Sequence, residues 1–252
     1  MEYILETKDL TVSFGGHVAV NGVTTGFPKN QLKSIIGPNG AGKTTFFNLL
    51  SGQLKPTKGE VWFKGIDITH RSPDARTRLG IGRSFQITNV FPNLTVLENV
   101  RLAVQSQAGI HYQLLFHFKK YRKLEERAHQ ILEKVMLDHK SDFLAKNLTH
   151  GEKRKLEIAM LLALDSEVLL LDEPTAGMSL EEVPAIIEVI RGLKQENRTI
   201  ILIEHKVEMV LDLSDSLMVL FNGQLLAEGS PDEILRNERV QEAYLGGLHD
   251  AS

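Results

Sequence analysis

The stretch that decides the fold is Gly37-Pro38-Asn39-Gly40-Ala41-Gly42-Lys43-Thr44-Thr45. Residues 37–44 fit the pattern G-x-x-x-x-G-K-[ST] at every position. Glycines let backbone N–H groups converge on phosphate oxygens, and a helix that begins in the loop adds the partial positive charge of its N-terminus. We expect Lys43 to reach the β- and γ-phosphates and the Thr44 hydroxyl to ligate Mg²⁺. The loop therefore predicts binding of the phosphates of a nucleoside triphosphate.

The sequence on either side of this loop supplies the elements that a phosphate loop requires. Residues 32–36 are a short apolar run of strand length, and residues 44–50 predict a helix that ends at Ser51-Gly52. A glycine-rich turn without function would match the pattern by chance in a chain of this length with a frequency on the order of 1%. We therefore predict that all nine residues, 37–45, contact the nucleotide.

A second apolar run, residues 168–171, ends in two carboxylates, Asp172 and Glu173. A strand buried on both faces tolerates acids only at its C-terminal edge, where open α/β sheets bind ligands. We expect Asp172 to hold Mg²⁺, directly or through water, and Glu173 to accept a proton from the attacking water. By itself an Asp-Glu pair before Pro174 would as readily be a simple turn. The phosphate loop in the same chain favours the catalytic interpretation.

A third apolar run, residues 199–203, ends in Glu204-His205. A histidine at this edge of a sheet can contact the γ-phosphate or orient the catalytic carboxylate. A lone histidine is more often structural. We assign His205 a catalytic role because two other predicted strands end in residues expected to act on phosphate, namely the phosphate loop and the pair Asp172-Glu173.

The order of the apolar patterns predicts an α/β fold. The predicted strands are residues 4–14, 32–36, 61–63, 168–171, 199–203, 217–221 and 224–227. The predicted helices are residues 44–50, 94–107, 112–137, 153–164 and 180–196. Strand, helix and strand with apolar runs indicate a parallel sheet covered on both faces, and Asn222-Gly223 indicates a hairpin.

The bulk composition excludes several classes of protein. The chain has 252 residues, of which 42% are hydrophobic and 24% charged, as in ordinary globular proteins. A net charge of −3 gives no support for a surface that binds nucleic acid. The absence of cysteine excludes disulfides and thiolate metal sites. With no signal-peptide pattern and no apolar run near the roughly 18 residues of a membrane helix, we expect a cytoplasmic protein that reaches a membrane only through a partner.

Several further features follow one another in a particular order. Gln86 comes after residues 82–85, residues 148–152 open a helix, residues 173–178 follow the acidic strand, and His205 comes last. This order resembles that of the ATP-binding cassette (ABC) family: phosphate loop, Q-loop, signature motif, acidic strand, D-loop and H-switch. The resemblance covers essentially the whole chain.

The resemblance implies one nucleotide-binding domain over residues 1–252. Its P-loop NTPase sheet core would comprise residues 1–86 and 155–252. It would carry an N-terminal antiparallel β subdomain, and residues from about 87 to 154 would form an inserted helical subdomain.

The resemblance also implies roles for individual residues. Phe14 matches the aromatic that stacks on adenine, although a half-buried strand residue would look the same. Gln86 matches the residue that senses Mg²⁺ and the attacking water and links the site to the membrane partner. Thr149 and Gly151 match signature residues that contact the γ-phosphate bound by the opposite subunit. The resemblance therefore implies a head-to-tail dimer with two ATP molecules between the subunits.

Two motifs depart from the family pattern. The usual signature is Leu-Ser-Gly-Gly-Gln, whereas here His150 replaces the first glycine and Glu152 the glutamine. Thr149 keeps the hydroxyl, and a helix N-terminus remains for anion binding, so we expect function to survive. Ser179 stands at the position of the D-loop aspartate, which in the family contributes to coupling between the subunits.

Six stretches resemble one branch of the family, the ATPases of branched-chain amino acid importers: residues 14–16, 19–21, 82–86, 151–159, 227–231 and 242–246. This branch implies partner permease subunits, a second cassette ATPase and an external solute-binding protein, without nucleic acid. It implies a location on the inner face of the membrane through the permease. Urea importer ATPases share His150-Gly151 and residues 176–178, so urea or an amide is the alternative cargo.

Other classes of protein fit the sequence less well. Cassette ATPases of DNA repair have a long coiled coil between phosphate loop and signature, and those of ribosomes have two cassettes; this chain has no sustained heptads and one cassette. A P-loop GTPase or kinase has no use for the signature, and the guanine-reading pattern Asn-Lys-x-Asp is absent. The basic cluster at residues 119–123 precedes Glu125 and Glu126, which favours a solvated helix face over a lipid or nucleic-acid site.

Overall fold

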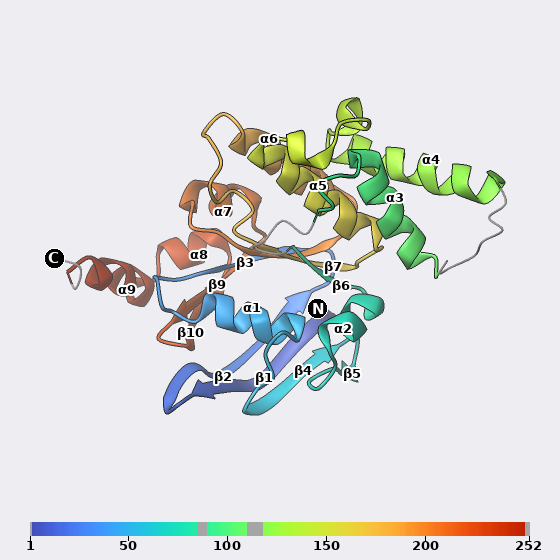
Figure 1. The fold of residues 1–252 in the computed structure, drawn as a ribbon. Coiled ribbons are helices and arrows are strands. Elements are labelled where there is room, and N and C mark those ends of the chain that lie inside the picture. Colours follow the sequence, from blue (N-terminus) through green and yellow to red (C-terminus); the bar gives the residue numbers. More distant parts are fainter. Residues whose placement is uncertain (1, 85–89, 110–117, 250–252) are drawn as a thin grey trace.

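The computed structural model describes residues 2–84, 90–109 and 118–249. Two sheets form two layers with helix α1 between them, and further helices cover the far side of the larger sheet (Figure 1). The four-stranded antiparallel sheet has the order β2 (His17–Pro28), β1 (Tyr3–Phe14), β4 (Lys58–Phe63), β5 (Ile66–Asp67). The six-stranded sheet has the order β10 (Gln224–Gly229), β9 (Ser216–Phe221), β3 (Leu32–Ile36), β8 (Thr199–Ile203), β7 (Val168–Asp172), β6 (Ile81–Arg83).

The helices in the described part of the chain lie between and after these strands. They are α1 (Lys43–Ser51), α2 (Pro73–Leu79), α3 (Val96–Gln107), α4 (Phe118–Lys134), α5 (His150–Ala163), α6 (Val183–Gln195), α7 (Val207–Leu213), α8 (Pro231–Leu235) and α9 (Glu238–His249). Among the described residues, none of these helices combines the length and the apolar character needed to cross a membrane.

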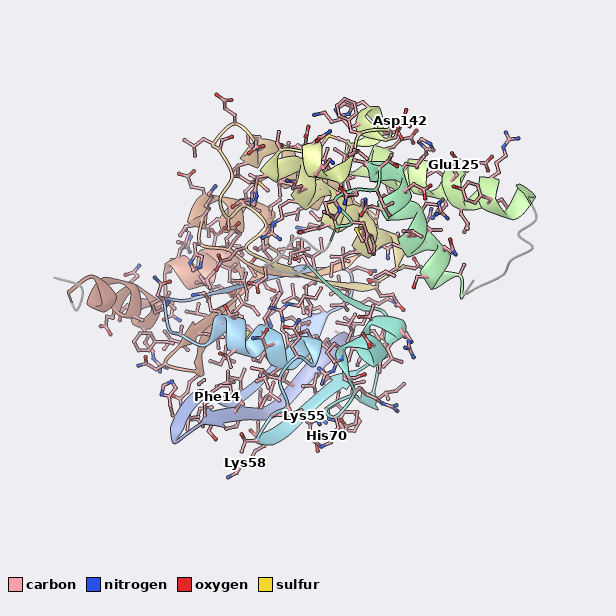
Figure 2. The ribbon with its side chains drawn as sticks, viewed as in Figure 1. Phe14, Lys55, Lys58, His70, Glu125 and Asp142 are labelled. Carbon is pink, nitrogen blue, oxygen red and sulfur yellow. The ribbon has the colours of Figure 1, made fainter. Side chains whose placement is uncertain are left out.

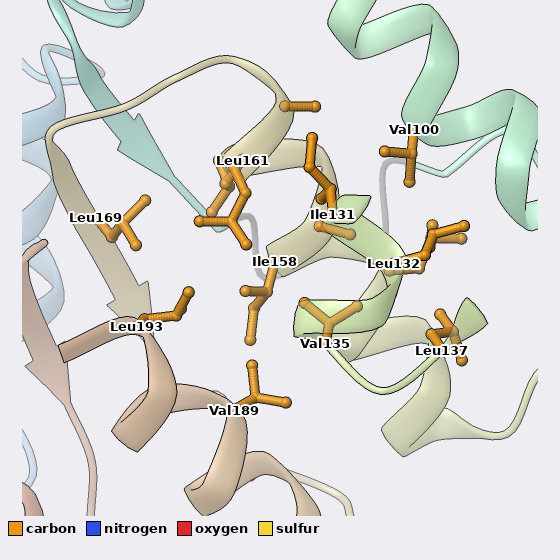
Figure 3. Packing of buried hydrophobic residues seen from close by; sticks show 14 of the residues in the cluster. Val100, Ile131, Leu132, Val135, Leu137, Ile158, Leu161, Leu169, Val189 and Leu193 are labelled. Atoms are coloured by element: carbon orange, nitrogen blue, oxygen red, sulfur yellow. The ribbon is translucent and has the colours of Figure 1, made fainter. Parts of the chain in front are cut away.

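The central sheet is buried on both faces, as the sequence predicts. All five residues of β7 and all five of β8 are buried. Side chains alternate across a strand, so Leu169 and Leu171 join the cluster with α3 to α6 (Figure 3), whereas Val168 and Leu170 join the cluster around α1. Strands β9, β3, β8, β7 and β6 are mutually parallel, with β10 antiparallel at one edge. The prediction of an α/β fold with an additional antiparallel β sheet is confirmed.

Helices α3, α4 and α5 share one apolar core beyond the sheet. Val100 of α3, Ile131 of α4 and Ile158 of α5 belong to the same buried cluster (Figure 3). On the outer surface Arg122 of α4 is 73% exposed and pairs with Glu126, as a solvated helix face predicts. The division of the chain at residues 154 and 155 stays a prediction. Helix α5 runs continuously across that point.

The predicted strands and helices are present, with ends that differ by a few residues. Strands β3 and β8 have the predicted bounds because each is a continuous apolar run. The predicted helix over 112–137 begins outside the described residues and is seen as α4. Strand β2 and helices α2, α7 and α8 were not predicted individually, since glycines interrupt β2 and the three helices have only five to seven residues.

The predicted hairpin joins β9 to β10. Asn222 and Gly223 both have positive φ, 48° and 75°, as the two central residues of a type I′ turn require. The turn also reaches other parts of the fold: the N–H of Gly223 donates to the carbonyl of Ala41 at 3.1 Å, and the N–H of Asn21 donates to the carbonyl of Gly223 at 2.8 Å. The hairpin therefore braces both the phosphate loop and β2.

Candidate functional site

The phosphate loop lies between the C-terminal end of β3 and the first turn of α1. Gly42 has φ of 93°, and a Cβ there would lie 2.5 Å from the carbonyl oxygen of Ala19. At Gly37 a Cβ would lie 2.1 Å from the carbonyl oxygen of Leu220. Only glycine fits at these two positions, because the loop is held against β2 on one side and β9 on the other. Among the described residues, no side chain caps the N-terminus of α1.

The ammonium of Lys43 lies over its own loop. Nζ donates to the carbonyl oxygens of Gly37 at 2.7 Å and Pro38 at 2.9 Å, and the residue is 7% exposed. Burial lowers the pKa of Lys43, and the nearby charge of Glu173 opposes that shift. The loop thus holds a positive charge where the sequence predicts phosphate binding.

One open pocket brings together predicted residues of four segments: the end of β1, the phosphate loop, and the residues after β7 and after β8. Its volume is about 400 Å³, and it is lined by Phe14, His17, Ala19, Asn39, Gly40, Ala41, Gly42, Lys43, Thr44, Thr45, Glu173 and His205. Phe14 is 49% exposed and lies at the end of β1, on the side of that sheet where α1 lies (Figure 2). An exposed aromatic that lines the pocket beside the phosphate loop is placed to stack on a planar group.

Glu173 and His205 meet at the edge of the sheet. They follow the adjacent strands β7 and β8, whose last residues are paired, Asp172 with Ile203. Nε2 of His205 donates to Oε1 of Glu173 at 2.8 Å, and both side chains are partly exposed to the pocket. A carboxylate in this position can accept a proton from water while the imidazole orients it.

The backbone of Glu173 is strained. Its φ is 45°, in the left-handed region that costs a residue other than glycine about 1–2 kcal/mol. Its N–H donates to the carbonyl of Ile203 at 2.9 Å. Such strain persists only where surrounding contacts fix the conformation, and it gathers at functional sites.

Asp172 is fully buried and forms an ion pair that the sequence did not reveal. Its Oδ2 accepts from Nη2 of Arg83 at 2.9 Å, and Arg83 also donates to Asn48, Ser51 and Gln53. Burial raises the pKa of Asp172, and the charge of Arg83 opposes that shift. Oδ1 is buried and has no hydrogen-bond partner among the described residues. An oxygen of this kind suits Mg²⁺, which takes one or two carboxylates together with substrate phosphates and water.

Comparison with known proteins adds to this geometry. A sequence model described as ABC transporter matches residues 20–176, and one described as branched-chain amino acid ATP-binding cassette transporter matches residues 224–250. The chain belongs to the ABC transporter family. As an ABC ATPase, it binds and hydrolyses ATP.

Two curated relatives of this ABC ATPase match nearly its whole length. The probable branched-chain amino acid transport ATP-binding protein LivG of Archaeoglobus fulgidus is 38% identical and is matched over 96% of this chain and 95% of its own. The high-affinity branched-chain amino acid transport ATP-binding protein BraF of Pseudomonas aeruginosa is also 38% identical, over 96% and 98%.

Solved structures show the same fold. A nucleotide-free ATP-binding cassette from an ABC transporter has a TM-score of 0.83 and 33% identity over 96% of this chain and 99% of that one. A dimeric ATP-binding cassette in a post-hydrolysis state, bound to ADP and Pi, has a TM-score of 0.74 and 25% identity over 90% and 98%.

The signature of this ABC ATPase is the capped N-terminus of α5. The N–H of Glu152 donates to the hydroxyl of Thr149 at 3.3 Å, and the N–H of Thr149 donates to the Glu152 carboxylate at 3.0 Å. Glu152, which stands at the position of the family's glutamine, thus completes a capping box. His150 contacts the carbonyl of Ala176 through Nε2 at 3.0 Å, which links the signature to the D-loop.

The anion position at this helix end holds a carboxylate of the same chain. Oε1 of Glu182 accepts from the N–H of Gly151, and Oε2 accepts from the N–H of Ser179, each at 3.3 Å. Hydrogen bonding, chiefly from the Thr149 side chain, lowers the pKa of Glu182. The role of Glu182 was missed because 31 residues separate it from Gly151.

Several predicted residues do not line the pocket: Gly37 and Pro38 lie at the start of the phosphate loop, and Asp172 is fully buried next to Glu173. Thr149 and Gly151 do not line it. Gln86 lies outside the described residues, so its role stays a prediction.

Proposed function

We propose that this chain is the ATP-hydrolysing subunit of an ABC importer that moves branched-chain, hydrophobic amino acids through a partner permease. The observation that carries the proposal is the pair Glu173–His205, which meets at 2.8 Å in the same pocket as Lys43 and Thr44. A general base opposite a phosphate loop is the arrangement that hydrolysis of a bound triphosphate needs.

The residues of the pocket divide the work. The backbone N–H groups of the loop, which Pro38 lacks, and the ammonium of Lys43 hold the phosphates, and Thr44 with Asp172 would hold Mg²⁺. Bound Mg²⁺ neutralises charge on the phosphates. Glu173 takes the proton of the attacking water, and His205 keeps that carboxylate oriented. Gln86 senses the metal and the water.

The second half of the site comes from another subunit. Thr149 and Gly151 lie away from this chain's own pocket, at a helix N-terminus suited to anions. A dimeric cassette is among the similar structures. We therefore propose a head-to-tail dimer, with itself or with a second cassette ATPase, in which Phe14 stacks on adenine and the partner's signature closes over the γ-phosphate.

A groove between the sheet core and the inserted helical subdomain is the proposed docking site for the permease. It has a volume of about 1020 Å³ and lies between α2 and β6 on one side and α3 and α5 on the other. Its lining includes the charged side chains Asp74, Arg78, Asp165 and Glu167. Docking here would place the ATPase on the inner face of the membrane, with an external solute-binding protein delivering cargo to the permease.

The cargo follows from the relatives. LivG and BraF carry branched-chain amino acid transport in their names, and the second family match, at residues 224–250, does so too. Urea or an amide is the second candidate, favoured by His150-Gly151 and by residues 176–178.

Reconstitution tests the proposed cargo. The ATPase would be assembled with its co-purifying permease in liposomes, with the solute-binding protein outside. Leucine is expected to be taken up in an ATP-dependent manner and to stimulate hydrolysis, and urea to do neither. Uptake of urea without leucine would replace the cargo assignment, and recovery of the chain with ribosomes or DNA would overturn transport itself.

A further inference from the structure

A buried carboxylate next to the Glu173–His205 pair has no part in the function proposed above. Glu204 lies between the last residue of β8 and His205, and it is 4% exposed. Burying an ionised carboxylate is unfavourable unless its oxygens accept hydrogen bonds. The donors around Glu204 therefore indicate what its charge holds in place.

The two oxygens of Glu204 bind two different loops. Oε1 accepts from the N–H of Thr175 at 3.0 Å and from the Thr175 hydroxyl. Oε2 accepts from the N–H of His205 at 2.9 Å and from that of Lys206 at 3.3 Å. Thr175 is 2% exposed and follows β7, whereas His205 and Lys206 follow β8. One carboxylate thus ties the D-loop to the H-switch.

These contacts close a ring around the catalytic pair. The imidazole of His205 binds Glu173, the backbone of His205 binds Glu204, and Glu204 binds Thr175, two residues after Glu173. The left-handed backbone of Glu173 lies inside this ring. The ring consists of the pair Glu173 and His205 together with Glu204, next to His205, and Thr175, two residues after Glu173.

We propose that Glu204 is a positioning residue for ATP hydrolysis. It fixes the distance between the loops after β7 and β8, so that the imidazole of His205 meets the carboxylate of Glu173. It acts through His205 and touches no reacting atom. The inference rests on the proposed roles of Glu173 and His205.

The two arms of the carboxylate can be tested separately. Accepting from His205 and Lys206 would satisfy N–H groups just before α7, and that alone would stabilise the helix. The arm to Thr175 satisfies a buried N–H and hydroxyl and also joins the ends of two strands, so turnover measurements must show whether that join matters for catalysis. Thr175→Val removes the hydroxyl of that arm and leaves the arm to α7 intact.

The first experiment compares kcat with ATP affinity in the assembled transporter. In Glu204→Gln we expect kcat to fall at least about tenfold while the affinity for a fluorescent ATP analogue stays within about twofold, because misplacing a catalytic group affects turnover. Thr175→Val should also lower kcat, and Thr175→Ser, which keeps the hydroxyl, should restore it.

Glu228→Gln is the matched control. Glu228 also accepts from a threonine hydroxyl, that of Thr25 at 2.7 Å, and it pairs with Lys33 on the same sheet away from the pocket. Its substitution should lower the thermal unfolding temperature without lowering kcat. Unchanged kcat in both Glu204→Gln and Thr175→Val would overturn the inference.

A double-mutant cycle with His205→Ala isolates the route of the effect. If Glu204 acts through His205, Glu204→Gln should lower kcat no further in the His205→Ala background, since coupled residues are not additive. Independent losses that multiply would contradict the inference. Normal turnover in His205→Ala or Glu173→Gln would overturn the proposed function instead, so the two failures are distinguishable.

Discussion

The phosphate loop and the signature both end at a helix N-terminus, yet they present it in opposite ways. At α1 the residue before the helix is Gly42, and no side chain in the described part of the chain caps this end. At α5 the side chains of Thr149 and Glu152 cap the helix, and the carboxylate of Glu182 lies on the N–H of Gly151. The first end is ready for a ligand of its own chain. The second holds the carboxylate of Glu182, which in the proposed dimer a phosphate bound to the partner would displace.

Glu173→Gln should give the largest effect. The amide keeps the shape of the carboxylate and loses the base, so we expect kcat to fall by about 10²–10⁴ while ATP binding persists. Gel filtration with ATP should show a trapped dimer. Monomer only, together with undiminished phosphate release, would contradict the assignment of the base.

Lys43→Ala tests the phosphate loop at the uncapped N-terminus of α1. Loss of a charge-assisted contact worth about 1.5–3 kcal/mol should weaken ATP binding by roughly 10–100-fold. Calorimetry on the isolated chain would measure it, with circular dichroism to check the fold. An unchanged dissociation constant would mean that Lys43 does not hold the phosphates.

Glu182→Gln tests the occupied end. Removing the charge frees the N-terminus of α5 for a partner's phosphate, so we expect the ATP-dependent dimer of a Glu173→Gln background to tighten by about threefold to tenfold. Analytical ultracentrifugation would measure the dimer. Glu181→Gln, the exposed neighbouring acid, is the control. If both substitutions tighten the dimer equally, the effect comes from the change in net charge and not from the contact of Glu182 with the helix end.

Glu152→Gln should have the smallest effect. Glutamine also completes a capping box, and the lost ion pair with Lys140 is partly exposed. The free energy of unfolding should therefore change by less than about 1 kcal/mol. Glu152→Ala, which removes the cap, should cost about 1 kcal/mol in chemical denaturation. A large loss in both variants would show that the ion pair, and not the cap, holds this end.

The sequence predicts what is local and periodic. Strands β3, β7 and β8 follow from apolar runs, and the residues at their ends follow from the direction of parallel strands. The contacts that tune the site were not predictable, because they join distant residues: Arg83 and Asp172 are 89 positions apart, and Thr175 and Glu204 are 29 apart. No periodic pattern reports such pairs.

The hairpin turn behind the phosphate loop has a consequence for affinity. Gly223 binds the carbonyl of Ala41, and the loop is pressed between β2 and β9, so its shape exists before any nucleotide arrives. The loop therefore loses little conformational entropy when a nucleotide binds. Most of the free energy of its contacts with phosphate then contributes to affinity. Distorting this turn should therefore weaken nucleotide binding, although none of the described residues beyond His205 lines the pocket.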